Sequence, residues 1–160
     1  MLPGAGEMTL HSAITALERA CTEMGTQLFT ITTHDLEQGL FRRIHSSHPV
    51  EYPLHGTKPL ARDAWYEHCV LRGEPFIANE PEDFSKLFFD HVLITSMGLG
   101  SAANLPLVDE DGTVPGTVNL LAERGHFTTA RLDAYGGLVS RFCSAILPHI
   151  RFHSRGRREG

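Results

Sequence analysis

Two alternating apolar and polar segments flank a tight-turn signal, and this pattern constrains the fold more than any other feature. Residues 101–108 and 114–122 have the pattern of strands, and Asp111-Gly112 between them is a dipeptide typical of a β-hairpin. If these two residues form the turn, Asn104 faces Asn119 across the hairpin. The chain must then contain an antiparallel sheet.

The predicted hairpin has one apolar face and one polar face, because side chains alternate along a strand. The apolar face carries Ala103, Leu105, Leu107, Val118 and Leu120. The polar face carries Asn104, Pro106, Thr117 and Asn119. We expect the apolar face to lie beneath the terminal helices. The polar face should border a cavity, because buried amides need hydrogen-bond partners.

A helix is predicted near each end of the chain. Residues 9–24 carry a narrow apolar stripe at helical spacing, Leu10, Ile14, Leu17, Cys21 and Met24, with Gly25 after it. Such a stripe is typical of a seam against another long helix. A last helix starts at Thr128 or Thr129, and Pro148 should end or kink it.

The middle of the chain mixes short elements. Residues 26–34 and 40–46 are predicted strands, and the proline-containing stretch 47–60 is predicted to be a long loop. A short helix over 64–72, an extended piece over 75–78 and a helix over 82–97 follow. The order predicts an α+β fold. Its antiparallel sheet of five to six strands has the N- and C-terminal helices on one face and the inserted helices and loop over the other.

Composition fits one globular domain over 1–150, followed by a basic tail, 151–160, that we expect to be disordered. Outside the tail, 10 basic residues stand against 18 acidic ones, which argues against nucleic acid as a partner. No apolar run approaches the length of a membrane helix, and the N-terminus has no signal-peptide pattern. Three scattered cysteines, Cys21, Cys69 and Cys143, indicate reduced thiols and a cytoplasmic protein.

Two segments resemble the GAF family of sensor domains: DAWYEHCVLRGEPFIAN, and LFFDHVLITSMGLGSAANLPLVDEDGTVPGTVNLL ending at Leu121. The resemblance covers roughly residues 10–147 and implies a GAF/PAS-like sheet and a small-molecule sensor. The Asn-Lys-Phe-Asp-Glu signature of cyclic-nucleotide-binding members cannot be placed on this chain. Pigment-binding members use a Cys beside a His, which here occurs only as His68-Cys69, in the wrong helix. Members that reduce free methionine sulfoxide use loop cysteines, whereas the three here lie in predicted helices.

The candidate ligand-binding residues are Asn104, Asn119, Thr117, His91, Trp65 and Tyr52. The two asparagines either bind a ligand or bond each other, a loop backbone or trapped water. His91 either donates to a ligand or is a satisfied core residue. Trp65 would wall a pocket and Tyr52 close over it, unless both serve packing. No catalytic grouping is present, and the histidines around 34–55 lack the framework of a metal site.

These features favour a non-catalytic sensory module that binds a small organic ligand, with no cofactor identified. Loop 47–60 would act as its lid, and a homodimer through helices 9–24 and 128–147 would pass on the signal. Two alternatives stay open: an enzyme of the free methionine-(R)-sulfoxide reductase type, and a dimerisation domain without ligand.

Overall fold

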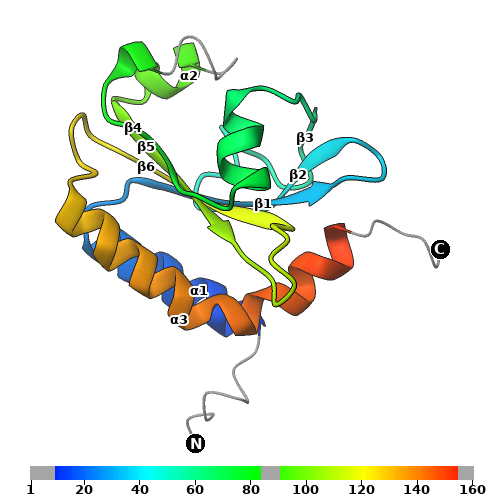
Figure 1. Ribbon diagram of the computed structural model, residues 1–160. Helices are drawn as coiled ribbons and strands as arrows, with labels where there is room; N and C mark the ends of the chain where they lie inside the picture. The colour runs from blue at the N-terminus through cyan, green and yellow to red at the C-terminus, as the bar shows by residue number, and fades with distance from the viewer. Residues whose placement is uncertain (1–9, 84–90, 155–160) are drawn as a thin grey trace, which may run out of the picture.

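The computed structural model describes residues 10–83 and 91–154. In chain order the elements are α1 (Leu10–Glu23), β1 (Leu28–Asp35), β2 (Leu40–Ser46), β3 (Thr57–Pro59), η2 (Tyr66–Leu71), β4 (Phe76–Ala78), η3 (Pro81–Asp83), α2 (His91–Ser96), β5 (Ser101–Leu107), β6 (Gly116–Ala122) and α3 (Thr129–Ser154). The six strands form one antiparallel sheet in the order β3-β2-β1-β6-β5-β4 (Figure 1). The α+β prediction is confirmed.

The register of the β5–β6 hairpin is the predicted one, but its turn is not. Asn104 pairs with Asn119 and Ala103 with Leu120. The amide of Asp109 donates to the carbonyl of Thr113, so the chain reverses over residues 110–112 and not over a two-residue turn. Gly112 has φ of 85°, the left-handed conformation that a glycine adopts without strain.

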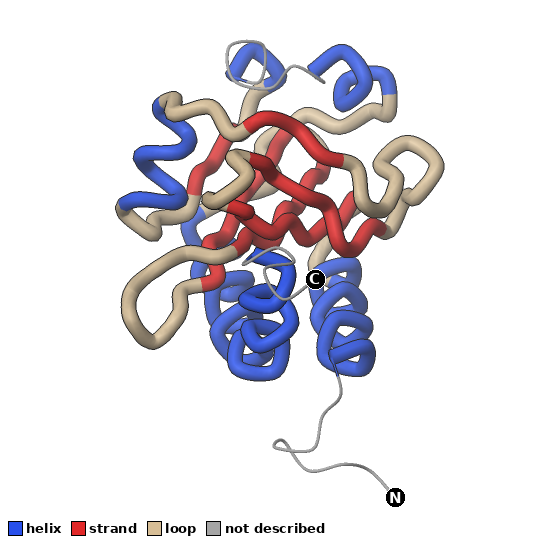
Figure 2. The backbone as a smooth tube through the Cα atoms, turned by 90° about the vertical axis from the view of Figure 1, so that its right-hand side faces the viewer, coloured by secondary structure: helices blue, strands red, loops and turns tan. Residues whose placement is uncertain are grey.

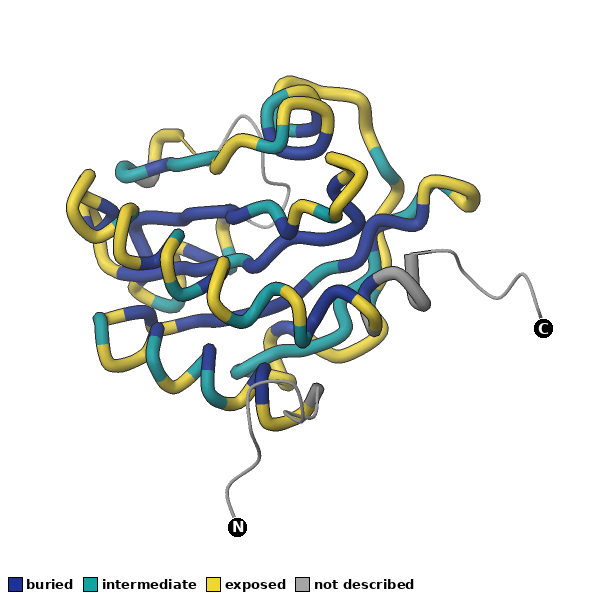
Figure 3. Tube along the Cα trace, turned by 60° about the horizontal axis from the view of Figure 1, so that its bottom comes forward, coloured by how far each residue is buried: buried dark blue, intermediate teal, exposed yellow. Residues whose placement is uncertain are grey.

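Helices α1 and α3 cover one face of the sheet, as predicted (Figure 2). The main core lies between them and the apolar side of the hairpin, and Leu17, Tyr135 and Ile146 are fully buried in it. Figure 3 shows that the central strands β1, β6 and β5 consist mostly of buried residues. The core thus fixes the sheet from below and leaves its other face to the inserted elements.

The α1 stripe is therefore used within the domain. Ala13, Ile14, Leu17 and Cys21 are buried in the main core and α1 packs along α3, so the predicted seam against another long helix is formed within the domain. The spacing of the stripe is equally typical of a helix packed on its own sheet. That the terminal helices also form a homodimer stays a prediction. With the stripe buried, a homodimer through these two helices would use their outer sides, and a Leu17→Glu variant would report on folding.

Helix α3 does not end at Pro148 but continues through it to Ser154. Proline lacks the amide donor and its ring crowds the carbonyl four residues earlier, but neighbouring packing can hold the helix together across it. Ile150, beyond the proline, is fully buried and lies against Gly116 of β6. This docking gives a reason for the helix to continue.

The other face of the sheet is covered by what we call the roof: residues 47–60, η2 and α2. The predicted loop 47–60 contains the edge strand β3, which pairs with β2. The predicted helix 64–72 is largely the π-type turn η2, and of the predicted helix 82–97 the structure describes η3 and α2. Residues 84–90 of that predicted helix lie outside the described residues. Among the described helices, none has both the length and the apolar character needed to cross a bilayer.

Candidate functional site

A cavity of about 300 Å³ lies between the sheet and the roof. It is lined by Leu28, Thr30, Thr32, Phe41, Arg43, Glu51, Tyr52, Gly56, Thr57, Lys58, Trp65, Leu93, Ile94, Ala102, Asn104, Thr117, Asn119 and Leu121. The strand residues form its floor because they alternate toward the face away from α1 and α3. Its volume is at the lower end of the range for ligand pockets.

The two asparagines stand at the centre of a hydrogen-bonded chain across the floor. The Trp65 indole Nε1 donates to Asn104 Oδ1 at 2.9 Å, and Asn104 Nδ2 donates to Asn119 Oδ1 at 2.9 Å. Asn119 Nδ2 then donates to Thr30 Oγ1 at 3.1 Å and to Thr32 Oγ1 at 2.9 Å. Of the predicted alternatives, the one in which the asparagines bond each other is what the structure shows.

Trp65 sets the donor-to-acceptor direction of this series of hydrogen bonds. An indole N–H can only donate, so Asn104 must turn its oxygen toward the ring and its nitrogen toward Asn119. Asn119 must then present its own oxygen to Asn104 and its nitrogen to the two threonines. The hydroxyls of Thr30 and Thr32 are thereby used as acceptors, and each keeps a proton to donate.

Thr117 adds a further polar group to the floor. Its side chain is 1% exposed, and its Oγ1 has no hydrogen-bond partner among the described residues. Thr117 lies opposite Thr32 in the β1–β6 pairing, so the two hydroxyl-bearing residues are neighbours on the floor. A buried hydroxyl without a partner costs free energy, and a bound molecule or water would relieve this cost.

Arg43 joins the sheet to the roof. Its amide donates to Gly56 O at 2.9 Å, its carbonyl accepts from His55 N at 2.8 Å, and its Nη1 donates to Pro53 O at 2.9 Å. Its guanidinium lies over the Tyr52 ring, 4.9 Å from the centroid. His55 has φ of 64°, an uncommon conformation for a residue with a side chain. Residues 52–56 are therefore wrapped closely around one cationic side chain at the pocket wall.

Polarity changes along the length of the pocket. One end is apolar, where Leu28, Ala102 and Leu121 pair across three strands and Ile94 of α2 packs with them. The opposite end carries Thr32 and Thr117, with Arg43 paired to Thr32 across β1 and β2. Lys58 also lines the pocket, with its Nζ 5.6 Å from the centroid of the Phe41 ring. The hydrogen-bonded side chains of Asn104 and Asn119 lie between the two ends of the pocket.

Five of the six predicted site residues line this one cavity: Tyr52, Trp65, Asn104, Thr117 and Asn119. His91 begins α2, and its side chain lies outside the described part of the structure. That any of them binds a ligand stays a prediction. Sequence reasoning missed Thr30, Thr32, Arg43 and Lys58. The alternation of β1 carried a signal for the threonines, since extending the sheet register from Asn119 would have placed them on the polar face.

The cysteines are held as thiols in apolar surroundings. All three are free, and burial raises the pKa of Cys21 and of Cys69 to about 12. Cys69 is a buried residue of η2, and its Sγ donates to the backbone carbonyl of Asn104 at 3.8 Å. Burial also raises the pKa of Cys143, which contacts the hairpin. Thiols with raised pKa values hold little thiolate at neutral pH and are poor nucleophiles.

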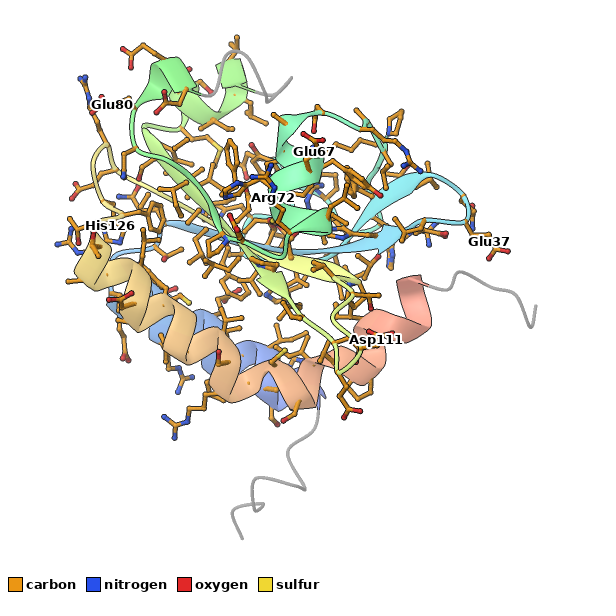
Figure 4. The ribbon with its side chains drawn as sticks, in the orientation of Figure 1. Glu37, Glu67, Arg72, Glu80, Asp111 and His126 are labelled. Carbon is orange, nitrogen blue, oxygen red and sulfur yellow. The ribbon has the colours of Figure 1, made fainter. Side chains whose placement is uncertain are left out.

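A second buried polar cluster lies outside the pocket, at the amino-terminal end of α3, where Figure 4 labels His126. Thr26 Oγ1 donates to the Tyr135 hydroxyl at 2.9 Å, which leaves the phenol proton for His126 Nε2 at 2.7 Å. Burial lowers the pKa of His126 and raises that of Tyr135. The cluster ties the turn before β1 to α3, so its role is structural.

The histidines considered as metal ligands are dispersed. His45 bonds Glu18 of α1 at 2.7 Å, and His34 Nδ1 donates to the Val114 carbonyl at 2.9 Å. A β-bulge beside Ile31 and Thr32 turns His45 to the helical side of the sheet. Among the described residues, no three His, Cys, Asp or Glu side chains gather closely enough to hold a metal ion.

Comparison with known proteins finds structures of the same fold, whereas comparison by sequence finds no match. No family model matches the chain, and no curated protein matches it in sequence. The crystal structure of the GAF domain/HD domain protein from Geobacter sulfurreducens matches with a TM-score of 0.70 at 18% identity, over 92% of this chain and 97% of that one. The GAF domain of a two-component sensor histidine kinase from Bacillus halodurans matches with 0.69 at 12% identity, over 91% and 98%. The type II free methionine-R-sulfoxide reductase from Thermoplasma acidophilum matches with 0.56 at 10% identity, over 86% and 94%.

Proposed function

Since the chain has the GAF-domain fold, we propose that it is a sensory module that binds a small organic molecule in the cavity between the sheet and the roof. The observation that carries the proposal is the floor of that cavity. Its amides are already oriented by Trp65, while the Thr117 hydroxyl has no partner. A polar group that is buried, positioned and unused is typical of a site arranged for a ligand.

Signal output would pass from the roof to the terminal helices. Residues 52–56 are held by Arg43 on β2, and β2 contacts α1 through the His45–Glu18 pair. A ligand that orders the roof would therefore act on the sheet that α1 and α3 cover. We place the homodimer surface on the outer sides of those helices and the protein in the cytoplasm, where its free thiols stay reduced.

The test is a thermal-shift screen of metabolites, with native mass spectrometry of the purified protein. A ligand at about 100 times its Kd should add about 2.7 kcal/mol to the free energy of unfolding. Replacing Ala102, at the apolar end of the floor, by Phe should abolish the shift by filling the cavity, while Ala20→Phe on α1 is the matched control. A screen without any stabilising compound, and a protein that carries no copurifying molecule, would favour the dimerisation domain without ligand.

The reductase alternative requires a reactive thiol. Two of the three cysteines are buried and burial raises the pKa of all three, which argues against it, and the comparison with the Thermoplasma enzyme supports only the common fold. Thiol-dependent reduction of free methionine sulfoxide that disappears in a Cys69→Ser variant would reverse this conclusion.

A further inference from the structure

We propose, resting on the ligand-binding function above, that the ligand is a small amphipathic monocarboxylate. Its carboxylate would lie over Thr32 and Thr117 near Arg43, and its apolar body would lie toward α2. Three properties of the pocket carry this inference: the direction of the floor hydrogen bonds, the charge of the lining residues and the apolar character of one end.

The floor offers donors. Because Asn119 donates to both Thr30 and Thr32, these hydroxyls have protons left, and the described residues provide no acceptor for them. Thr117 Oγ1 is buried without a partner, and the second N–H of Asn104 also has none among the described residues. A bound group that meets this floor must therefore be rich in acceptor oxygens, as a carboxylate is.

The charges favour a single negative charge. The ionisable residues among those lining the pocket are Arg43, Lys58 and Glu51, which leaves a net charge of one positive unit. The backbone of Arg43 pairs with Thr32 in the sheet, and its guanidinium is held by Pro53 O and lies over the Tyr52 ring. A monocarboxylate balances this charge, whereas a phosphate ester would exceed it and an amine would add to it.

The apolar end of the pocket determines the length and the apolar character expected of the rest of the ligand. The Leu28–Leu121–Ala102 row is four residues along the strands from the Thr32–Thr117 row, which at the usual rise is about 13 Å. Ile94 and Tyr52 pack with that row. One aromatic ring with a short carboxylate chain fits both this length and the cavity volume.

The experiment uses three probes of one shape: 3-phenylpropanoate, its neutral amide 3-phenylpropanamide and the cation 3-phenylpropylamine. Trp65 is the single tryptophan, so its indole N–H gives one resolved NMR signal that reports directly on the floor. The propanoate should shift this signal and bind at least about tenfold more tightly than the amide, because hydrogen bonds to a charged acceptor are stronger. The amine should not bind.

Two matched variants distinguish an effect on the pocket floor from an effect on the protein surface. Thr117→Val keeps the side-chain shape but removes the hydroxyl, and it should weaken the propanoate by about tenfold and the neutral amide by less, because a hydrogen bond to a charged acceptor is the stronger one. Thr15→Val, on the exposed side of α1, should change neither. Circular dichroism of each variant shows whether it is folded.

The outcomes distinguish this inference from the function on which it rests. Equal or tighter binding of the amide or the amine at Trp65 overturns the carboxylate assignment and leaves ligand binding standing. No response of the Trp65 signal to the propanoate also overturns the assignment, and the metabolite screen then decides separately whether the cavity binds another molecule. A propanoate whose affinity is the same in Thr117→Val does not lie on this floor, which refutes the proposed placement.

Discussion

At the scale of single residues, one indole determines the chemistry of the pocket. Asparagine can turn either end toward a partner, so two facing asparagines alone leave the direction of their bond open. Trp65 removes that freedom because it can only donate to Asn104. Asn119 therefore donates to the two threonine hydroxyls, and each hydroxyl keeps its own proton to donate to another group.

His34 gives the clearest pH dependence. It is fully buried between β1 and the roof, and burial lowers its pKa from 6.5 to about 4. The unfolded chain therefore binds a proton in this range that the folded chain does not, so stability falls as the pH drops from about 6.5 to about 4. The loss should reach about 3 kcal/mol, and it is absent above the unfolded pKa.

Urea denaturation at a series of pH values checks this prediction. His34→Gln cannot titrate, so its free energy of unfolding should fall less steeply with pH than that of the unchanged protein. His11, exposed on α1, provides the control, since His11→Gln should leave the slope unchanged. Parallel curves for the protein and its His34→Gln variant would show that His34 takes up its proton in the folded state as readily as in the unfolded one.

At the scale of elements, what the sequence predicts depends on how local the cause is. The hairpin register, the facing asparagines and the two terminal helices follow from alternation and helical spacing within short segments, and all are confirmed. The α1 stripe indicates a seam against another long helix, and that helix is α3. Whether the partner helix belongs to the same chain or to a second copy could not be predicted, because the spacing is the same in both cases. Strand β3 lies in a stretch rich in proline, and it forms only because β2 offers its open edge to Thr57–Pro59.

The same distinction between local and tertiary causes applies to the residues of the pocket. Asn104, Asn119 and Thr117 were predicted together because they share one face of one hairpin. Arg43 was missed because its position depends on the bulge in β2 and on the return of residues 53–56, both of which are tertiary effects. The bond from Trp65 to Asn104 joins residues 39 positions apart, which no local pattern encodes.

The contact between α3 and β6 gives a prediction at this scale. A Cβ at Gly116 would lie 2.7 Å from the Thr32 carbonyl and 2.9 Å from Ile150 Cγ2. Gly116→Ala should therefore destabilise the protein by about 2 kcal/mol, because the backbone of β1 cannot move aside as a side chain could. Gly136→Ala is the matched control, since it is helical and nothing lies within 4 Å of its added Cβ. It should stabilise by about 0.5–1 kcal/mol.

Chemical denaturation of both variants gives the comparison. If Gly116→Ala is as stable as the unchanged protein, β1 and α3 are not held as closely against Gly116 as these two distances imply.

At the scale of the whole molecule, the sheet separates two unlike halves. Below it, α1 and α3 enclose a continuous apolar core that contains Phe29, Leu120 and Tyr135. Above it, the roof has two smaller apolar clusters, one around Leu28 and Tyr52 and one around Phe41 and Tyr66, with the cavity lined by members of both. The half with the smaller clusters should open more readily than the half with the single core.

This difference predicts how ligand binding changes hydrogen exchange. Opening of the roof destroys the pocket, so a ligand at about 100 times its Kd should slow exchange of the roof amides by roughly 100-fold. The amides of Tyr52, His55 and Arg43 are suitable reporters because each is hydrogen-bonded within or to residues 48–56. The amides of Asp109 and Gly112 are bonded within the hairpin turn, which does not line the cavity, so local fraying there should continue at its previous rate. Hydrogen exchange followed by NMR resolves these positions, and an equal slowing at both sites would mean that roof and turn open only together, in a single global unfolding. The two halves would then form one cooperative unit, and a ligand could act on the terminal helices only by stabilising the whole fold.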